Sequence, residues 1–568
     1  MSQVKPKTRR ITQACDFCHR RGIKCRAASS ACGSPLDSST STALTPCLTC
    51  VEYAQECTRL RQPKKRGTKP RSSSQVTSPA GLSPPESSVK RITAICTHDL
   101  GSSVSQPLCN RKIVTALLDV YLDTIHPTFP LWCERELWVG WRNGSFPETP
   151  SDFMSLMCMC ALSAQHVGDG ALFSGDVSSD EAAILAQDYL QEAIRLVPTD
   201  FDEPSSNIIR SYGFLALLGA QIGNSAMAHK YLGLYHGLSA RFDLHDESRW
   251  PVGISQCERE VRRRLWWAMY RLEVHTACVL GSLVRCPEAQ ANVGYPSGLH
   301  HPAFIPGRDG DFEDWFAGWN STTDLYRVLE HAICDFRSRQ RPHRPSILHE
   351  ARDGTVIATL ITERLSRIQQ ELLPQFGTVS SRSSDSGRNR CGFQAVNILC
   401  TIHLARMISS LSWGDDLQSA CRTARDMMLN MKSIPLEYVR AVGSPLLQQL
   451  AGVGHMLVGV ANKHDLQRAE YIQLTDVLTS IIEFLAQLKE CNKTAAAAEK
   501  RLNDQLLKLS QSMPEDDIHD HVVDFEITNP LDGPNLLCPS YLDQLSPSSL
   551  DGGDFFTTSL LSTFMWPR

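Results

Sequence analysis

A mainly α-helical protein is predicted by the sequence, with a small cysteine-rich module ahead of a large all-α body. From about residue 110, apolar residues recur at positions i, i+3, i+4 and i+7 in one segment after another, whereas the alternation typical of strands is scarce. Cysteines and basic residues dominate the first 71 positions. We therefore expect a cysteine-rich module at 1–71, a flexible linker at 72–109, the helical body at 110–511 and a disordered acidic tail at 512–568.

The linker and the tail are predicted from composition. Residues 72–89 read SSSQVTSPAGLSPPESSV, in which Ser and Pro dominate and no apolar periodicity is present. The tail holds ten Asp/Glu and one Arg, and bulky apolar residues lie among the acids. Such a composition is typical of a disordered segment that docks into a groove of a partner. The candidate docking side chains are Phe555, Phe556 and Trp566.

Charge is distributed unevenly along the chain. Residues 1–71 carry a net charge of +11, and because the whole chain carries −4, the remainder carries −15. A basic segment on an acidic body suggests a polyanionic partner for that segment alone. The basic, polar start argues against a secretory signal, and no apolar run approaches the roughly 18 residues of a membrane helix. We therefore expect an intracellular protein with reduced cysteines and no membrane partner.

Six of the cysteines form two copies of a C-x2-C-x6-C pattern, Cys15, Cys18 and Cys25 followed by Cys47, Cys50 and Cys57. In a reduced protein this repeat favours a metal site, and zinc prefers four thiolates. Six thiolates hold two zinc ions only if two of them bridge, and the repeat nominates the first of each half. The 21-residue loop before Cys47 contains Cys32, which is an alternative ligand. A single zinc site or free thiols are the other interpretations.

This region resembles the fungal binuclear zinc-cluster transcription factors, a family of nuclear DNA-binding regulators. The resemblance implies a binuclear zinc-cluster module in which two zinc ions share the six cysteines, with the first and the fourth bridging. Pro46 matches a loop proline that is common in the family. Two further stretches, Tyr121–Trp132 and Glu258–Ser282, resemble the fungal-specific transcription factor domain, which is the middle homology region of the same family.

The resemblance also implies where DNA is contacted. The segment between the second and third cysteines is expected to be a short helix whose end enters the major groove. Arginine and lysine suit guanine, which presents two acceptors together. Gly22 stands where many relatives have a base-reading lysine, which makes Arg21 the candidate for that contact. The candidate DNA-binding residues are Arg20, Arg21, Lys24 and Arg26, and the sequence leaves open which of them read a base and which contact phosphate.

A run of basic residues follows Cys57. We interpret it as a phosphate-contacting arm that doubles as a nuclear localisation signal, with a solvated charged linker as the alternative. Its PKKRGTK stretch is similar to the arm of some maltose-type activators. The basic residues of the arm are Arg59, Arg61, Lys64, Lys65, Arg66, Lys69 and Arg71.

The segment RRRLWWAMYRLEV in the body is interpreted as an amphipathic helix. Leu265, Met269 and Leu272 are expected to face the core, whereas Arg262–Arg264 and Arg271 are expected to lie elsewhere. Acidic groups of the same domain are the expected partners of these arginines, and an acidic protein partner is the alternative. The chain shows no Gly-rich phosphate loop, G-x-S-x-G elbow or H-E-x-x-H motif, so we expect no enzyme.

Together these features predict a sequence-specific nuclear transcription factor for RNA polymerase II genes. It is expected to recognise a CG-rich, CGG-like element in double-stranded DNA and to act as an activator through contacts of the acidic tail with the transcription machinery. The alternative is a zinc-bearing transcriptional co-regulator or scaffold without base-specific DNA binding. Residues 72–110 show no heptad repeat, so binding as a monomer and as a homodimer formed by the helical body are both open.

Overall fold

The computed structural model describes residues 14–21, 23–26, 46–58, 108, 110–171, 177–198, 205–297, 314–339, 354–413, 417–462 and 466–512. The chain divides into two compact units, Met1–Pro84 and Pro85–Arg568. Among the described residues every regular element is a helix, and the one strand-like pairing is an isolated bridge between Asp246 and Asn292. The predicted fold class, a mainly α protein with an N-terminal cysteine cluster, is confirmed.

In the described part of the first unit, two short helices, α1 (Asp16–Arg20) and α2 (Leu48–Glu52), pack against each other. Their small core consists of Cys15, Cys18, Cys47 and Cys50. Phe17, Ile23, Cys25 and Cys57 are partly buried against these four thiols. Among the described residues of this unit, no aliphatic or aromatic side chain is fully buried, so hydrophobic burial alone is a weak source of stability for this part.

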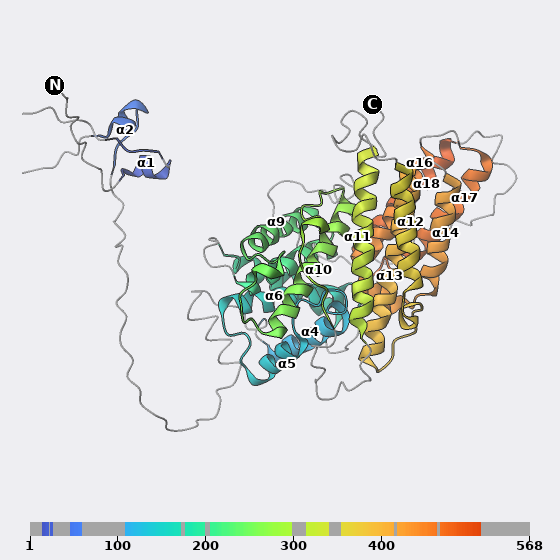
Figure 1. Ribbon diagram of the computed structural model, residues 1–568, viewed down its shortest axis with the longest axis horizontal. Helices are drawn as coiled ribbons and strands as arrows, with labels where there is room; N and C mark the ends of the chain where they lie inside the picture. Colours follow the sequence, from blue (N-terminus) through green and yellow to red (C-terminus); the bar gives the residue numbers. More distant parts are fainter. Residues whose placement is uncertain are drawn as a thin grey trace, which may run out of the picture. The chain divides into compact units, whose positions relative to one another are not determined.

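The second unit is a large helical body (Figure 1). In its first part, α6 packs against α7 and α8, and α8 packs against α9. The helices of this part are α4 (Arg111–Val120), α5 (Glu134–Asn143), α6 (Pro150–Gly168), α7 (Ser179–Arg195), α8 (Ser206–Gln221), α9 (Ser225–Arg241) and α10 (Gln256–Leu280). A π-helical turn, Tyr121–Ile125, extends α4.

The second part of the body is built around two long neighbouring helices, α11 and α13 (Figure 1). Next to them, α14 packs against α13 and α17, and α18 packs against α16 and α17. The helices of this part are α11 (Trp315–Arg339), α12 (Gly354–Gln370), α13 (Ser386–Trp413), α14 (Leu417–Ser433), α15 (Leu436–Val442), α16 (Ser444–Ala461), α17 (Arg468–Ala486) and α18 (Lys493–Ser512).

One hydrophobic core runs through both parts of the body, from Leu108 to Leu509. Polar contacts join the parts as well. Arg390 of α13 forms a buried ion pair with Glu134 of α5, with 2.8 Å between Nη2 and the carboxylate. The Trp319 indole donates to the Thr128 carbonyl at 3.0 Å. The two parts are therefore packed into a single unit.

The last part of the body is divided into two helices at Asn492. Residues 466–511 form two helices, α17 and α18, that pack against each other. Asn492 separates them, because its side chain accepts from the backbone N–H groups of Thr494 and Ala495 and so caps the start of α18. Asparagine at that position is the sequence signal for the break.

A stretch of α13, Ser386–Leu411, is long and apolar enough to cross a membrane by length and composition alone. However, 83% of its most apolar window is buried inside the body. The helix packs against α11 on one side and α14 on another. A core helix explains the apolar composition without a membrane.

The expected orientation of α10 is wrong for Arg262, Arg264 and Arg271. Their side chains are buried in the body, with exposed fractions of 7%, 2% and 3%. The Arg264 guanidinium lies 4.8 Å from the ring centroid of Phe316, and that of Arg271 lies 4.9 Å from Trp319. Aromatic faces attract guanidinium groups and pack along their stems. The pattern suggested a helix with a solvent-facing side, whereas α10 is surrounded by neighbours along most of its length.

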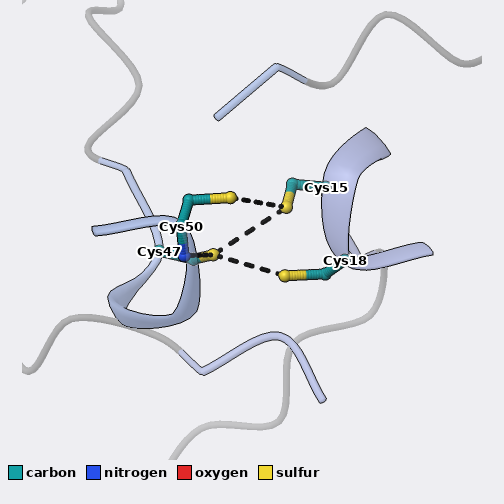
Figure 2. Close-up of side chains that lie close together, drawn as sticks. All are labelled: Cys15, Cys18, Cys47 and Cys50. Atoms are coloured by element: carbon teal, nitrogen blue, oxygen red, sulfur yellow. Dashed lines mark hydrogen bonds between the residues drawn. The ribbon is translucent and has the colours of Figure 1, made fainter. Parts of the chain in front are cut away.

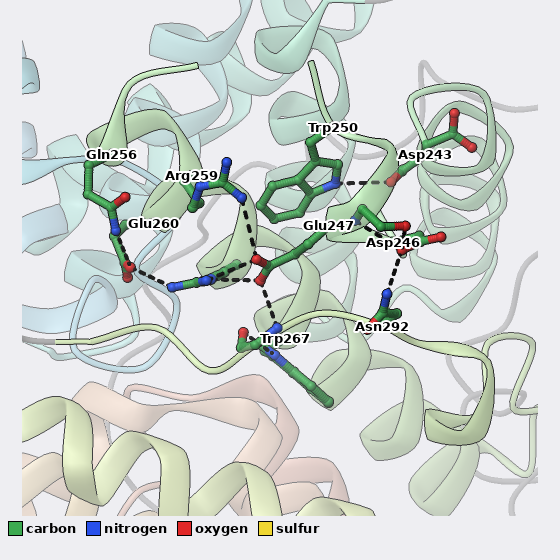
Figure 3. Close-up of polar contacts among 12 residues, drawn as sticks. Asp243, Asp246, Glu247, Trp250, Gln256, Arg259, Glu260, Trp267 and Asn292 are labelled. Carbon is green, nitrogen blue, oxygen red and sulfur yellow. Dashed lines mark hydrogen bonds and ion pairs between the residues drawn. The ribbon is translucent and has the colours of Figure 1, made fainter. Parts of the chain in front are cut away.

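Arg262 and Arg263 do find carboxylates within the body. Arg262 pairs with Glu258 at 2.9 Å. Arg263 pairs with Glu260 at 2.9 Å and with Glu247 at 2.7 Å, and Glu247 also lies near Arg259 (Figure 3). This part of the arginine cluster therefore has acidic partners in its own domain, which was the expected arrangement.

Candidate metal centre

The two C-x2-C-x6-C segments have the same local backbone structure. Cys15 and Cys47 are the N-cap residues of α1 and α2, with φ/ψ values of −64°/163° and −71°/149°. Cys18 and Cys50 are the third residues of these helices. After each helix the chain turns back in the same way, because Ile23 N–H donates to the Cys18 carbonyl at 3.0 Å and Gln55 N–H donates to the Cys50 carbonyl at 2.9 Å. We call Cys15–Arg26 the first half and Cys47–Thr58 the second half.

Reciprocal hydrogen bonds join the two halves. The Asp16 N–H donates to the Thr58 carbonyl at 2.9 Å, and the Leu48 N–H donates to the Arg26 carbonyl at 2.9 Å. In each case the residue after the first cysteine of one half bonds to the residue after the third cysteine of the other half. The backbone of the module therefore has an approximate internal two-fold symmetry.

Four sulfur atoms meet where the halves face each other (Figure 2). The Sγ atoms of Cys15, Cys18, Cys47 and Cys50 all lie within 4.8 Å of one another, and the four side chains are buried. The Sγ–Sγ distances are 3.8 Å for Cys15–Cys47, 3.5 Å for Cys15–Cys50 and 3.7 Å for Cys18–Cys47. A tetrahedral zinc ion with bonds of about 2.3 Å separates its sulfur ligands by roughly 3.8 Å. The thiols are thus spaced as ligands of a metal ion.

The third cysteine of each half lies at the edge of this group. Cys25 and Cys57 are partly buried and pack against the four central thiols. The Cys57 sulfur accepts from the Cys47 N–H at 3.4 Å. Both thiols are therefore next to the central group, although they are not among the four that already lie within ligand distance of one another.

The four central thiols differ in pKa. Burial opposes the ionisation of Cys15, yet hydrogen bonds from the Cys18 backbone and from neighbouring thiols lower its pKa to about 6. Burial also opposes ionisation of Cys47, and the Cys50 backbone N–H and nearby thiols lower its pKa. In contrast, burial raises the pKa of Cys18 to about 12 and also raises that of Cys50. The first cysteine of each half is thus the one best prepared to become a thiolate.

The exposed charge differs between the halves. Arg20, Arg21, Lys24 and Arg26 are exposed, and Arg20 and Arg21 end α1. At the equivalent positions, 32 residues later, the second half has Glu52, Tyr53, Glu56 and Thr58. Arg26 differs from the other three basic residues because its guanidinium pairs with Glu52. The basic surface therefore belongs to the first half alone.

Several predicted residues lie outside the described part of the chain. They are Gly22, Cys32, the arm residues Arg59, Arg61, Lys64, Lys65, Arg66, Lys69 and Arg71, and the tail residues Phe555, Phe556 and Trp566. The linker and the tail also lie there, apart from Leu108 and Ser512. The boundaries and roles assigned to these segments stay predictions.

A second group of potential metal ligands lies in the body, where Cys133, Glu136 and Cys257 approach one another within 4.8 Å. Cys133 is the N-cap of α5, and Cys257 lies in the first turn of α10. A hydrogen bond from Cys257 lowers the pKa of Cys133 to about 7. No spacing pattern in the sequence indicates this group, because only the fold brings the two cysteines together.

Comparison with known proteins gives a family match in the first part of the body. Residues 118–303 match the family model of the fungal specific transcription factor domain. Both Tyr121–Trp132 and Glu258–Ser282 lie inside this match, so the predicted resemblance is confirmed there. The match ends before α11, although the hydrophobic core continues to Leu509.

Three curated fungal proteins are similar to the chain. Maltose fermentation regulatory protein MAL13 of Saccharomyces cerevisiae is 23% identical over 292 residues, which cover 49% of this chain and 54% of that protein. Zinc finger protein grt1 of Schizosaccharomyces pombe is 23% identical over 30% of this chain and 25% of its own length. Transcription factor macR of Penicillium terrestre is 26% identical over 25% of this chain and 18% of its own length. The chain thus spans about half of the first relative and less of the other two.

Proposed function

We propose that this chain, which carries a fungal specific transcription factor domain together with an N-terminal cysteine module, is a transcription regulator that binds specific DNA sequences through a two-zinc cluster. The observation that carries the proposal is the meeting of two repeated cysteine segments around four buried thiols, with basic side chains on one segment only. The similarity to a maltose regulator, a zinc finger protein and a transcription factor supports the same function.

The proposed zinc ligands are Cys15, Cys18, Cys25, Cys47, Cys50 and Cys57. Support for bridging by Cys15 and Cys47 comes from the contacts between halves. Cys15 lies 3.5 Å from Cys50 of the second half, and Cys47 lies 3.7 Å from Cys18 of the first half. This is the spacing expected if each of these two thiolates shares an ion with the opposite half. Zinc would then hold together a module that has little hydrophobic core.

The first half is the proposed DNA-binding surface. Arg20, Arg21 and Lys24 are exposed at the end of α1 and directly after it, where a short helix can enter the major groove. The Thr49 hydroxyl donates to the Lys24 carbonyl at 2.9 Å, so the second half supports the backbone that carries these side chains. Glu52 and Glu56 would repel phosphates from the second half. We assign Arg26 a supporting role, because Glu52 already pairs with its guanidinium.

Binding to selected DNA tests the central part of the proposal. The full-length, zinc-loaded chain is incubated with a random duplex library, and bound sequences are enriched over several rounds. We expect a CG-rich motif, loss of binding in EDTA, recovery with added zinc and a steep fall in affinity with salt. Zinc-dependent binding without an enriched motif would favour the co-regulator or scaffold, and binding that survives EDTA would contradict a role of the cluster.

The remaining proposals are nuclear localisation through the basic arm and activation of RNA polymerase II genes by the acidic tail. Their support is the composition of residues 59–71 and 512–568. A reporter gene behind the selected motif tests activation. Replacing Phe555, Phe556 and Trp566 together by Ala should lower reporter output several-fold while DNA affinity stays unchanged. A rise in output would identify a repressor instead.

A further inference from the structure

A pocket lies inside the helical body, among α8, α10, α11 and α16. We call it the central pocket, and Leu217, Arg271, His275, Tyr326, Val442 and Gln449 are among its lining residues. It has about 610 Å³ of empty space, counting its opening to solvent. Its lining combines residues within the matched domain with residues from helices that follow it. The pocket therefore exists only when both parts of the body are packed together.

Arg271 is the charged group of this lining. It is 3% exposed, and its Nε and Nη1 atoms are buried without a hydrogen-bond partner. Its guanidinium lies 4.9 Å from the ring centroid of Trp319 and 5.4 Å from that of Tyr326. These ring contacts provide no hydrogen-bond acceptor for the Nε and Nη1 atoms, which stay available to a ligand. Among the described carboxylates, none forms an ion pair with Arg271.

Arg271 is charged near pH 7, whereas the two histidine rings of the pocket are neutral. The pKa values of His166 and His275 are lowered to about 4 by burial, so both rings are neutral near pH 7. Burial lowers the pKa of Arg271 only to about 10, which leaves it charged.

Two hydroxyl groups of the pocket can bond to a ligand. Gln449 donates to the Tyr326 hydroxyl at 3.2 Å, so the hydrogen of that hydroxyl can be donated to another group. The buried hydroxyl of Thr124 lacks a partner.

We propose that the central pocket binds a small aliphatic carboxylate, whose carboxylate group pairs with Arg271. A buried cation without an anionic partner is costly, and a carboxylate matches the fork of N–H donors on a guanidinium. A single positive charge suits a monoanion, whereas a phosphate dianion would remain poorly compensated. The apolar lining, which includes Leu217, Leu272 and Leu446, suits a short hydrocarbon chain.

Direct binding measurements test this proposal, and they do not require DNA binding by the cysteine module. The full-length chain is titrated calorimetrically at pH 7 with acetate, isobutyrate and isovalerate, with isovaleramide as the neutral analogue and with inorganic phosphate. We expect saturable binding of one branched carboxylate per chain, and a higher melting temperature in its presence. The amide should bind at least about tenfold more weakly, because it carries no charge for Arg271.

A matched pair of variants locates the site. Arg264 is also buried in α10 against an aromatic ring and also has unpartnered Nε and Nη1 atoms, but it does not line the central pocket. Arg271→Met should weaken carboxylate binding at least about tenfold, whereas Arg264→Met should change it less than about threefold. Val442→Phe keeps Arg271 and narrows the pocket, so it should weaken isovalerate binding more than acetate binding. If Arg271→Met does not fold, the Val442→Phe variant tests whether isovalerate binds in the central pocket.

Three results would overturn the proposal. They are the absence of binding by every carboxylate to the wild-type chain, undiminished binding to the folded Arg271→Met variant, and tighter binding of phosphate than of any carboxylate. If Arg271→Met is unfolded, isovalerate binding that Val442→Phe leaves unchanged would overturn it as well.

Discussion

The two halves of the cysteine module share a backbone and differ in charge. Each half begins with a cysteine that caps a one-turn helix, and each donates one backbone hydrogen bond to the other. At equivalent exposed positions, however, the first half has Arg20 and Lys24, whereas the second half has Glu52 and Glu56. A shared pair of metal ions requires similar geometry from both halves, whereas a DNA surface requires basic residues on only one. Under the proposed function, both halves therefore bind metal, whereas the first half alone contacts DNA.

The largest expected effect tests the symmetry of metal binding. Cys15→Ser and Cys47→Ser should each reduce bound zinc from about two ions per chain to fewer than one and weaken DNA binding roughly 100-fold or more, because each removes a ligand of both ions. Zinc is measured by plasma mass spectrometry of the full-length chain. Cys32→Ser is the control and should bind zinc and DNA as the wild-type chain does. If Cys32→Ser loses zinc while Cys47→Ser retains it, Cys32 is the fourth ligand.

The next effect tests the asymmetry of DNA binding. Arg21→Glu should weaken binding to the selected DNA about 10- to 100-fold, because it removes a proposed guanine contact and adds a repelling charge. Tyr53→Glu places the same charge at the equivalent position of the second half and should change affinity less than about twofold. Fluorescence anisotropy at a fixed salt concentration measures the DNA affinity of both variants. Equal losses in the two variants would mean that both halves face the DNA.

A smaller effect concerns the acidic surface of the second half. Glu56→Lys should raise DNA affinity a few-fold, because it removes a charge that repels phosphate. Its dependence on salt should remain close to that of the wild-type chain, unless the new lysine makes a phosphate contact and steepens the salt slope by about 1. Anisotropy titrations at several salt concentrations distinguish the two cases. A fall in affinity would contradict the proposed orientation.

The smallest effect concerns the ion pair between the halves. Arg26 and Glu52 are both half exposed, and such pairs contribute about 0.5 kcal/mol. A double-mutant cycle of Arg26→Ala and Glu52→Ala, measured as the free energy of unfolding of the zinc-loaded chain, should give a coupling energy of this size. A tenfold loss of DNA affinity from Arg26→Ala alone would show that Arg26 contacts DNA directly.

Spacing and periodicity predicted much of the helical fold and the approach of the two cysteine segments. Equal spacing implies equal local structure, so the repeat alone indicated that Cys15 and Cys47 have equivalent places. The burial of Arg271 could not be predicted in this way, because it depends on which helices surround α10. The same limit applies to Cys133 and Cys257, which are brought together by the packing of α5 and α10.

The continuous core of the body also limits how the gene can be divided. A stop codon at the end of the matched segment, residue 303, would remove Arg390 and with it the buried Arg390–Glu134 ion pair. Loss of one partner of a buried pair costs about 3–5 kcal/mol, and the exposed face of the remaining helices would add to the damage. Such an allele should yield a rapidly degraded product. A hybrid gene that borrows the regulatory portion should therefore take residues 110–511 as one piece.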